Sequence, residues 1–255
     1  MKKILLPISF SEESAHSIKS ASKLFENVEL TLLHCYPVRV YNRKYDFGDQ
    51  DYEEGLRSML HQFYMKHKVN GKVRFKLIVR PGNVSEVISS ISHLFDLIVI
   101  SRKQLIKNND LWYSDKVFYI ASKGQCPVLI LPKGLENFSF NKCDGIWHIK
   151  RREIEIDVLK KNLPRIEISP DSVLVKSLEQ TNFKSSFWKA IITYTKNHDD
   201  RLLKIMEEST KNEKIDLIIL LSHGKDTFQK FMKSELIQLI NHFDIPLLIF
   251  QAERK

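Results

Sequence analysis

Histidine and cysteine are the residues of this sequence whose side chains could most readily act as bases, nucleophiles or metal ligands. The chain has nine histidines, no two of them four residues apart, and three cysteines, Cys35, Cys126 and Cys143, without the paired spacing of a metal site. It also lacks G-x-S-x-G, P-loop and H-E-x-x-H sequences. These absences favour a protein that is not an enzyme, and they predict no metal site. We expect Cys126 to be a core residue.

Two places could still contact a ligand. His34 ends a predicted strand, 29–35, and would face the edge of the sheet where ligands bind, although we favour a bond from its ring to a backbone group. His223 and Lys225 flank Gly224 directly after a second apolar run. There they could meet an anion or lie in a solvated turn.

Short, continuous apolar runs bounded by turn residues indicate the strands that must hold these side chains. Such runs are typical of strands buried on both faces of a parallel sheet. The stretch 95–132 contains a strand, a polar loop, a helix and a second strand, and the same order recurs at 216–250. The sequence therefore predicts one α/β unit that is written twice.

The remaining periodic segments complete two similar halves. In the first half, the predicted strands are 2–8, 29–35 and 73–79, one predicted helix begins at Ser11, and two others span 52–67 and 84–94. In the second half, the predicted strands are 145–150, 172–178 and 187–194, and the predicted helices are 151–162 and 199–210. Ser11 is a predicted N-cap, with acidic residues in the turn that follows it. Alternating strands and helices predict a parallel sheet covered on both faces, with right-handed crossovers. The segment 134–142 is the predicted linker.

Length and composition indicate a soluble protein of two domains. The chain has 255 residues, 43% hydrophobic and 28% charged, and no apolar run that approaches the ~20 residues of a membrane helix. Residues 1–7 differ from a signal peptide because Ser11, Glu12 and Glu13 follow the apolar run. The odd number of cysteines predicts free thiols. Together with the lack of a signal-peptide or membrane-helix pattern, it predicts a cytoplasmic protein that has no membrane partner. The net charge of +9 comes from scattered lysines and arginines, so we expect a solvated surface and no nucleic-acid partner.

Five segments together resemble the universal stress protein family, in its tandem two-domain form: KILLPISFSEES at 3–14, LLHC at 32–35, Gly82 with EVI at 86–88, DLIVI at 96–100 and CPVLI at 126–130. The resemblance is close over residues 2–133, and beyond them it is limited to the order of elements and to residues 216–250. It implies two doubly wound, Rossmann-like α/β domains, at 1–133 and 143–255, each with a five-stranded parallel sheet of order 3-2-1-4-5. It also implies a pseudo-dimer, in which the two halves pair through their last strands, and a ligand crevice at the switch point of each sheet.

The nucleotide motif of the family is degenerate in the first half. Nucleotide-binding members carry G-x2-G-x9-G-[ST] after the fourth strand, where glycines let the backbone approach phosphates at the start of a helix. The corresponding positions are Ser101, Gln104, Ser114 and Asp115, and Ser9 stands where such members have an acidic residue. Ser114 and Asp115 are predicted to cap the next helix and to place a carboxylate in its first turn, which would repel phosphate. The resemblance therefore implies no conventional ATP site, and we expect no cofactor.

The second half departs from the motif differently. Its corresponding positions are Leu221, Gly224, Ser234 and Glu235, so one glycine remains. The alternative is therefore a protein that binds an adenine nucleotide, ATP or AMP, in its second crevice and hydrolyses ATP weakly. The leading expectation is a stress-response protein that acts as a regulatory or interaction module without ATP, as a homodimer or with a protein partner. The candidate crevice residues are Ser9, His34, Ser101, Gln104, Ser114, His223, Gly224 and Lys225.

Overall fold

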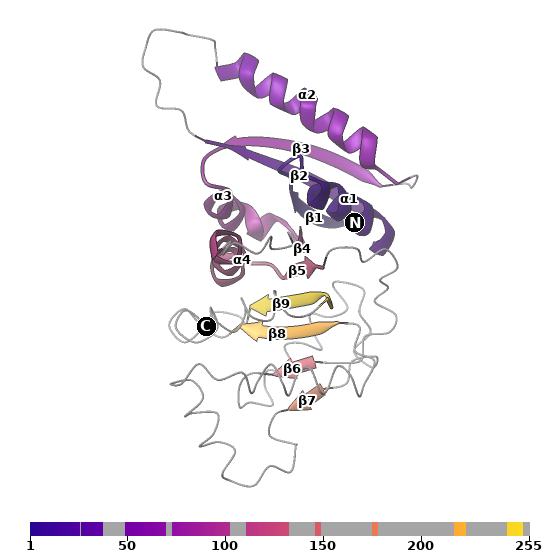
Figure 1. Cartoon of the computed structure of the whole chain (residues 1–255), viewed down its shortest axis with the longest axis vertical. Helices are drawn as coiled ribbons and strands as arrows, with labels where there is room; N and C mark the ends of the chain where they lie inside the picture. The colour runs from indigo at the N-terminus through magenta and orange to yellow at the C-terminus, as the bar shows by residue number, and fades with distance from the viewer. Residues whose placement is uncertain are drawn as a thin grey trace. The chain divides into compact units, whose positions relative to one another are not determined.

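The computed structural model describes residues 1–25, 27–37, 49–69, 73–102, 111–132, 146–148, 175–177, 217–222 and 244–251 (Figure 1). The chain divides into two compact units, Met1–Phe138 and Ser139–Lys255. The division falls within the segment 134–142.

Five parallel strands form the sheet of the first unit. They are β1 (Lys2–Pro7), β2 (Val28–Tyr36), β3 (Arg74–Pro81), β4 (Leu97–Ser101) and β5 (Val128–Leu131), and they lie in the order β3-β2-β1-β4-β5. Every residue of β4 and β5 is buried, as the continuous apolar runs predict, whereas β3 lies at an edge and is partly exposed. The structure thus confirms an α/β fold with a parallel sheet, in the order that the resemblance implies for the first half.

Helices cover both faces of this sheet. They are α1 (Glu12–Leu24), α2 (Asp49–His67), α3 (Val84–Ile91), which a 3-10 turn η1 (Ser92–Leu94) continues, and α4 (Leu111–Lys123). Figure 1 shows α1 and α2 on one side of the strands and α3 and α4 on the other. Because right-handed crossovers leave β1 toward β2 and β4 toward β5 on opposite faces, the carboxyl ends of β1 and β4 form the switch point of the sheet.

Local signals explain where α1 and α3 begin. Ser11 is the predicted N-cap of α1, and its hydroxyl accepts a hydrogen bond from the backbone N–H of Ser14 at 3.4 Å. Asn83 caps α3 in the same way, since its side-chain oxygen accepts from Ser85 N at 2.9 Å. Gly82, between β3 and α3, has a φ of 119°, which side chains rarely adopt.

The start of α4 differs from the prediction. The helix begins at Leu111, so Ser114 and Asp115 lie inside it, and its first turn contains no acidic residue. The predicted cap at Ser114 and the predicted carboxylate at the helix start are therefore wrong. The physical reason is that α4 contains neither glycine nor proline. Without the glycines of the motif nothing stops the helix from extending a turn toward the N-terminus.

Four parallel strands are described in the second unit. They are β6 (Ile146–His148), β7 (Val175–Ser177), β8 (Ile218–Ser222) and β9 (Leu247–Gln251), in the order β7-β6-β8-β9. Each coincides with a predicted strand. The predicted strand at 187–194 and the predicted helices at 151–162 and 199–210 lie outside the described residues.

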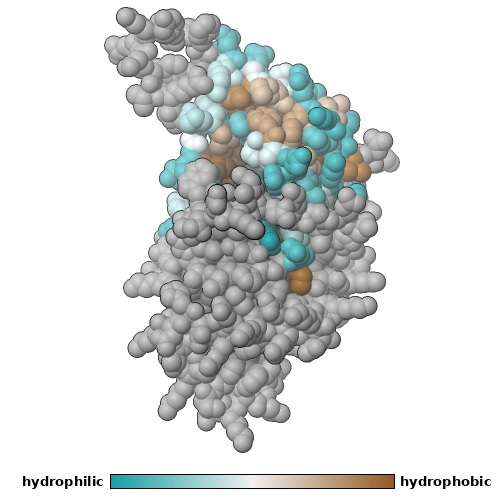
Figure 2. All heavy atoms as spheres, viewed as in Figure 1, coloured by the Kyte–Doolittle hydropathy of each residue, from teal (hydrophilic) through white to brown (hydrophobic). Residues whose placement is uncertain are grey.

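Apolar side chains from the strands and from α1 form the core of the first unit. Leu5, Leu30 and Ile98 in the sheet and Ile18 on α1 are fully buried, and burial of such a side chain stabilises a fold by about 1.5–3 kcal/mol. On the visible face of this unit, apolar residues lie among hydrophilic ones (Figure 2). Among the described residues, no helix combines the length and the apolar character that crossing a membrane requires.

Candidate functional site

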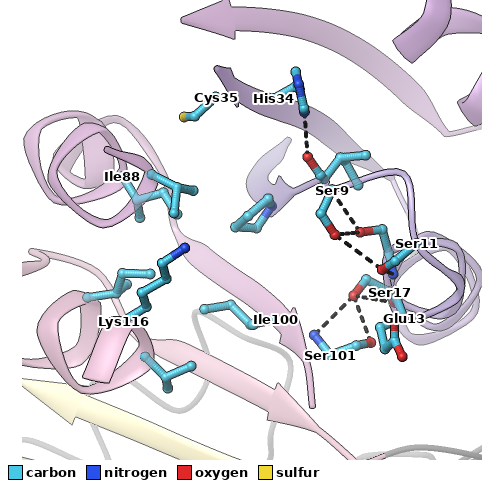
Figure 3. A pocket seen from close by; sticks show the side chains of 16 residues that line it. Ser9, Ser11, Glu13, Ser17, His34, Cys35, Ile88, Ile100, Ser101 and Lys116 are labelled. Carbon is cyan, nitrogen blue, oxygen red and sulfur yellow. Dashed lines mark hydrogen bonds between the residues drawn. The ribbon is translucent and has the colours of Figure 1, made fainter. Parts of the chain in front are cut away.

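A cavity of about 380 Å³ opens at the carboxyl ends of β1, β2 and β4. We call it the crevice. Strand ends contribute Ile8, His34, Cys35, Ile100 and Ser101; a serine-rich wall contains Ser9, Ser11, Glu13, Ser14 and Ser17; and α3 and α4 contribute Val84, Ile88, Lys116, Val117 and Ile120. Figure 3 shows the serines on one side and Ile88 and Lys116 on the other. The volume suits a small ligand, and the location is the switch point where α/β sheets bind one.

Three serines before and within α1 form one hydrogen-bonded cluster. The Ser9 hydroxyl donates to Ser11 Oγ at 3.1 Å, and it lies 3.1 Å from Ser14 Oγ. The Ser9 backbone N–H also donates to Ser14 Oγ, at 2.9 Å. These hydroxyls therefore form hydrogen bonds with one another and with the backbone of the first turn of α1, where Glu12 and Glu13 supply negative charge.

A second cluster joins α1 to β4. Ser101 N donates to Ser17 Oγ at 3.1 Å, and the two hydroxyl oxygens are 2.7 Å apart. His16 Nδ1 lies 3.1 Å from Ser101 Oγ, and its Nε2 lies 3.4 Å from Ser20 Oγ. Ser17 and Ser101 are 1% and 7% exposed, so their bonds satisfy polar groups that burial would otherwise penalise. The cluster fixes the end of β4 against α1.

His34 takes the backbone bond that the sequence interpretation favours. Its Nδ1 lies 2.8 Å from the carbonyl oxygen of Ile8. Because a carbonyl only accepts, Nδ1 carries the hydrogen, and Nε2 of the neutral ring is an acceptor. The ring of Phe10 lies against it, with centroids 4.5 Å apart. Phe10 has a φ of 59°, a left-handed conformation that costs about 1–2 kcal/mol and turns the chain from β1 toward α1.

Lys116 and Cys35 influence each other across the crevice. Burial raises the pKa of the Cys35 thiol to about 11, and the Lys116 ammonium opposes this rise. Burial lowers the pKa of Lys116, and Cys35 acts in the opposite direction. The Cys35 thiol therefore stays protonated near neutral pH and is not an activated nucleophile. Cys126 is buried, as predicted, and burial followed by the nearby Asp96 raises its pKa to about 12.

The structure brings together three of the candidate residues. Ser9, His34 and Ser101 all line the crevice. Ser114 lies within α4. The remaining candidates, Gln104, His223, Gly224 and Lys225, lie outside the described residues.

Three residues of the site were missed by sequence reasoning. Lys116, His16 and Ser17 contribute a cation and a link between α1 and β4. Lys116 precedes Val117 by one residue and Ile120 by four. Because this spacing is typical of one inward face of a helix, it could have indicated that Lys116 faces the crevice. The contacts of Ser101 with α1 join residues far apart in the chain, and no local pattern reports them. Within the described ranges, no three His, Cys, Asp or Glu side chains gather as a metal site would require.

The fold and the crevice define a doubly wound α/β protein with a small polar and apolar cavity at its switch point. The model of the universal stress protein family matches residues 1–132, more than half of the chain. The chain belongs to the universal stress protein family, and this membership links it to the stress response.

Solved structures share the fold at low sequence identity. A universal stress protein from Archaeoglobus fulgidus has a TM-score of 0.62 and 12% identity, covering 98% of this chain and 96% of that one. A functionally unknown protein from Pseudomonas aeruginosa PAO1 has a TM-score of 0.54 and 10% identity, covering 99% and 93%. A family member from Arabidopsis thaliana, solved with AMP bound, has a TM-score of 0.34 and 14% identity, covering 54% of this chain and 95% of that one. A comparison with curated proteins finds no significant match.

Proposed function

We propose that this chain is a regulatory or interaction module of the stress response, and that its first-unit crevice does not hold ATP. The observation that carries the proposal is the serine-rich wall. Its hydroxyls bond to one another, and Ser9 brings no carboxylate to the position where nucleotide-binding relatives have one.

Electrostatics at the start of α1 support the same proposal. A helix N-terminus attracts phosphate because its N–H groups point outward and its dipole is positive there. In α1 the Ser11 side chain already accepts from Ser14 N, and Glu12 and Glu13 occupy the first turn. A phosphate at this end of the crevice would meet like charge rather than open donors.

Isothermal titration of the full chain with Mg-ATP tests the proposal, together with chromatography of any nucleotide that the denatured protein releases. We expect no released nucleotide and no heat that depends on the crevice. The variant Lys116→Gln removes the one lysine or arginine among the described lining residues. ATP binding that this substitution abolishes would overturn the proposal.

A second candidate is an adenine-nucleotide site, for ATP or AMP, in the second unit. Its support is the sequence His223-Gly224-Lys225 directly after β8, together with the parallel pairing of β8 and β6, which repeats the pairing of β4 and β1. Heat from Mg-ATP that disappears in Gly224→Ala and Lys225→Gln, but survives in Lys116→Gln, would favour this candidate.

We also propose the tandem form of the family for this chain, acting in the cytoplasm, with the two halves paired through their last strands. The strand order β7-β6-β8-β9 supports it, because it corresponds to strands 2-1-4-5 of the first unit. The A. fulgidus structure, which matches along 98% of this chain, supports it as well.

A further inference from the structure

A second concave region lies between α1 and α2, and Ser11 is the described residue that it shares with the crevice at the strand ends. It has a volume of about 780 Å³, and we call it the α1–α2 groove. Its aromatic lining residues are Phe10 and Phe63, whose ring centroids lie 5.6 Å apart in an edge-to-face arrangement. Phe63 also contacts His67, with centroids 4.7 Å apart.

Basic side chains from both helices converge on this groove. Lys19 and Lys23 stand one turn apart on α1, and Lys66 and His67 end α2. The lysines are exposed, whereas His67 is half-buried. Burial lowers the pKa of His67, and Lys66 and then Lys19 lower it further, so positive charge from α1 reaches a ring on α2.

Interaction with the helix dipoles explains the position of only some of these basic side chains. Lys23, Lys66 and His67 lie in the last turns of their helices, where each positive charge complements the dipole by about 0.3–1 kcal/mol. Lys19 lies before the last turn and gains little from it. Among the described residues, neither Lys19 nor Lys66 pairs with a carboxylate. An anion bound in the groove would supply the partner that these two ammonium groups lack in the described part of the chain.

A carboxylate at one end of the groove limits the length of the anion that could bind there. Glu12 is its one acidic lining residue in the described part of the chain, and it stands seven residues before Lys19, or about 10 Å along the helix axis. A long polyanion that followed the groove would meet this carboxylate. A compact anion could lie at the basic end alone, where ammonium groups from two helices can each donate to phosphate oxygens.

We propose that the α1–α2 groove binds a small anion with two or more linked phosphate groups, held between Lys19 on α1 and Lys66 on α2. Among the described lining residues, the groove shares only Ser11 with the crevice, and the proposal does not rest on the function proposed above.

The experiment is isothermal titration of the full chain with sodium tripolyphosphate at low ionic strength. We expect one site per chain, with affinity at least tenfold weaker in Lys19→Gln/Lys66→Gln. The matched control is Arg57→Gln/Arg80→Gln, which removes two positive charges from exposed residues that do not line the groove. The control should bind within about twofold of the unaltered protein, because its two arginines do not line the groove. Since both pairs change the net charge equally, the difference between them reports contacts in the groove.

Proton NMR of His67 gives a second, local readout. The titratable groups that line the groove are Glu12, His16, Lys19 and Lys23 on α1 and Lys66 and His67 on α2. A bound polyphosphate should raise the pKa of His67 in the unaltered protein and in the Arg57/Arg80 control, but not in the Lys19/Lys66 variant.

Three results would overturn the inference. They are the absence of binding, equal loss of affinity in both variant pairs, and tighter binding of a single-stranded RNA oligonucleotide than of tripolyphosphate. Equal loss would indicate general attraction by net charge, and preference for RNA would indicate an extended polyanion surface. Each leaves the proposal about the crevice intact, since Lys116 lies outside the groove.

Discussion

Cys35 is the crevice residue whose chemistry its surroundings change most. Its raised pKa, about 11, predicts slow alkylation of the native protein by iodoacetamide. At pH 7.5 the rate should be roughly 100-fold or more below that of an exposed cysteine, because only the thiolate reacts. The rate should then climb with pH toward about 11. Peptide mass spectrometry after timed alkylation measures Cys35 separately from Cys126 and Cys143.

Substitution of Lys116 tests the cause of this behaviour. The ammonium lowers the Cys35 pKa, so Lys116→Met should raise it and slow alkylation at pH 9. Lys123→Met, on the same helix but outside the crevice, is the matched control and should leave the rate unchanged. An alkylation rate that stays the same or increases in Lys116→Met would contradict the account.

Single residues of the site were predictable where a local pattern determines them. The strand that ends beside His34 and the cap at Ser11 both follow from neighbouring residues, and both agree with the structure. The bonds of Ser101 with His16 and Ser17 cross from β4 to α1. Serine has no periodicity that marks it as buried, so this cluster depends on a tertiary contact that one sequence does not display.

At the scale of elements, two glycines in different settings give opposite predictions. Gly82 joins β3 to α3 with a φ of 119°, and an added Cβ would meet Val87 Cγ2 at an ordinary 3.5 Å. The cost of Gly82→Ala is therefore backbone strain, and we expect the free energy of unfolding to fall by about 1–2 kcal/mol. Chemical unfolding followed by far-UV circular dichroism measures the change.

Gly55 supplies the matched control for that experiment. It lies inside α2, and an added Cβ would meet nothing within 4 Å. Gly55→Ala should raise the free energy of unfolding by about 0.5–1 kcal/mol, because alanine loses less conformational freedom in a helix. If both substitutions shifted stability in the same direction, the conformational argument at Gly82 would fail.

Strands were more predictable than helix ends. Buried strands such as β4 and β5 require continuous apolar side chains, and that requirement is written directly in the sequence. The start of α4 depends on how many residues before Ser114 adopt the helical conformation. Alignment with a motif placed that start too late, because the glycines that would mark it are missing.

At the scale of the whole molecule, the sequence repeat predicts two similar halves, but local patterns do not show how those halves pack together. The four strands described in the second unit match their predicted positions, and the predicted strand at 187–194 lies outside the described residues. How the two halves meet depends on complementary surfaces, which a one-dimensional pattern does not encode. The net charge of +9 likewise did not indicate that Lys19 and Lys66 would meet in one groove, because they come from helices that only the fold brings together.

The proposed pairing of the halves predicts how the chain behaves when its linker is cut. β5 reads Val-Leu-Ile-Leu and is last in the strand order of the first unit, and β9 carries Leu-Leu-Ile-Phe. Such apolar strands would form aggregation-prone edges if left unpaired. With a protease site inserted in 134–142, the two fragments should therefore co-elute in size-exclusion chromatography at the position of the uncut protein. Elution as two independent, soluble monomers would show that each half covers its own last strand, and the paired arrangement would then be wrong.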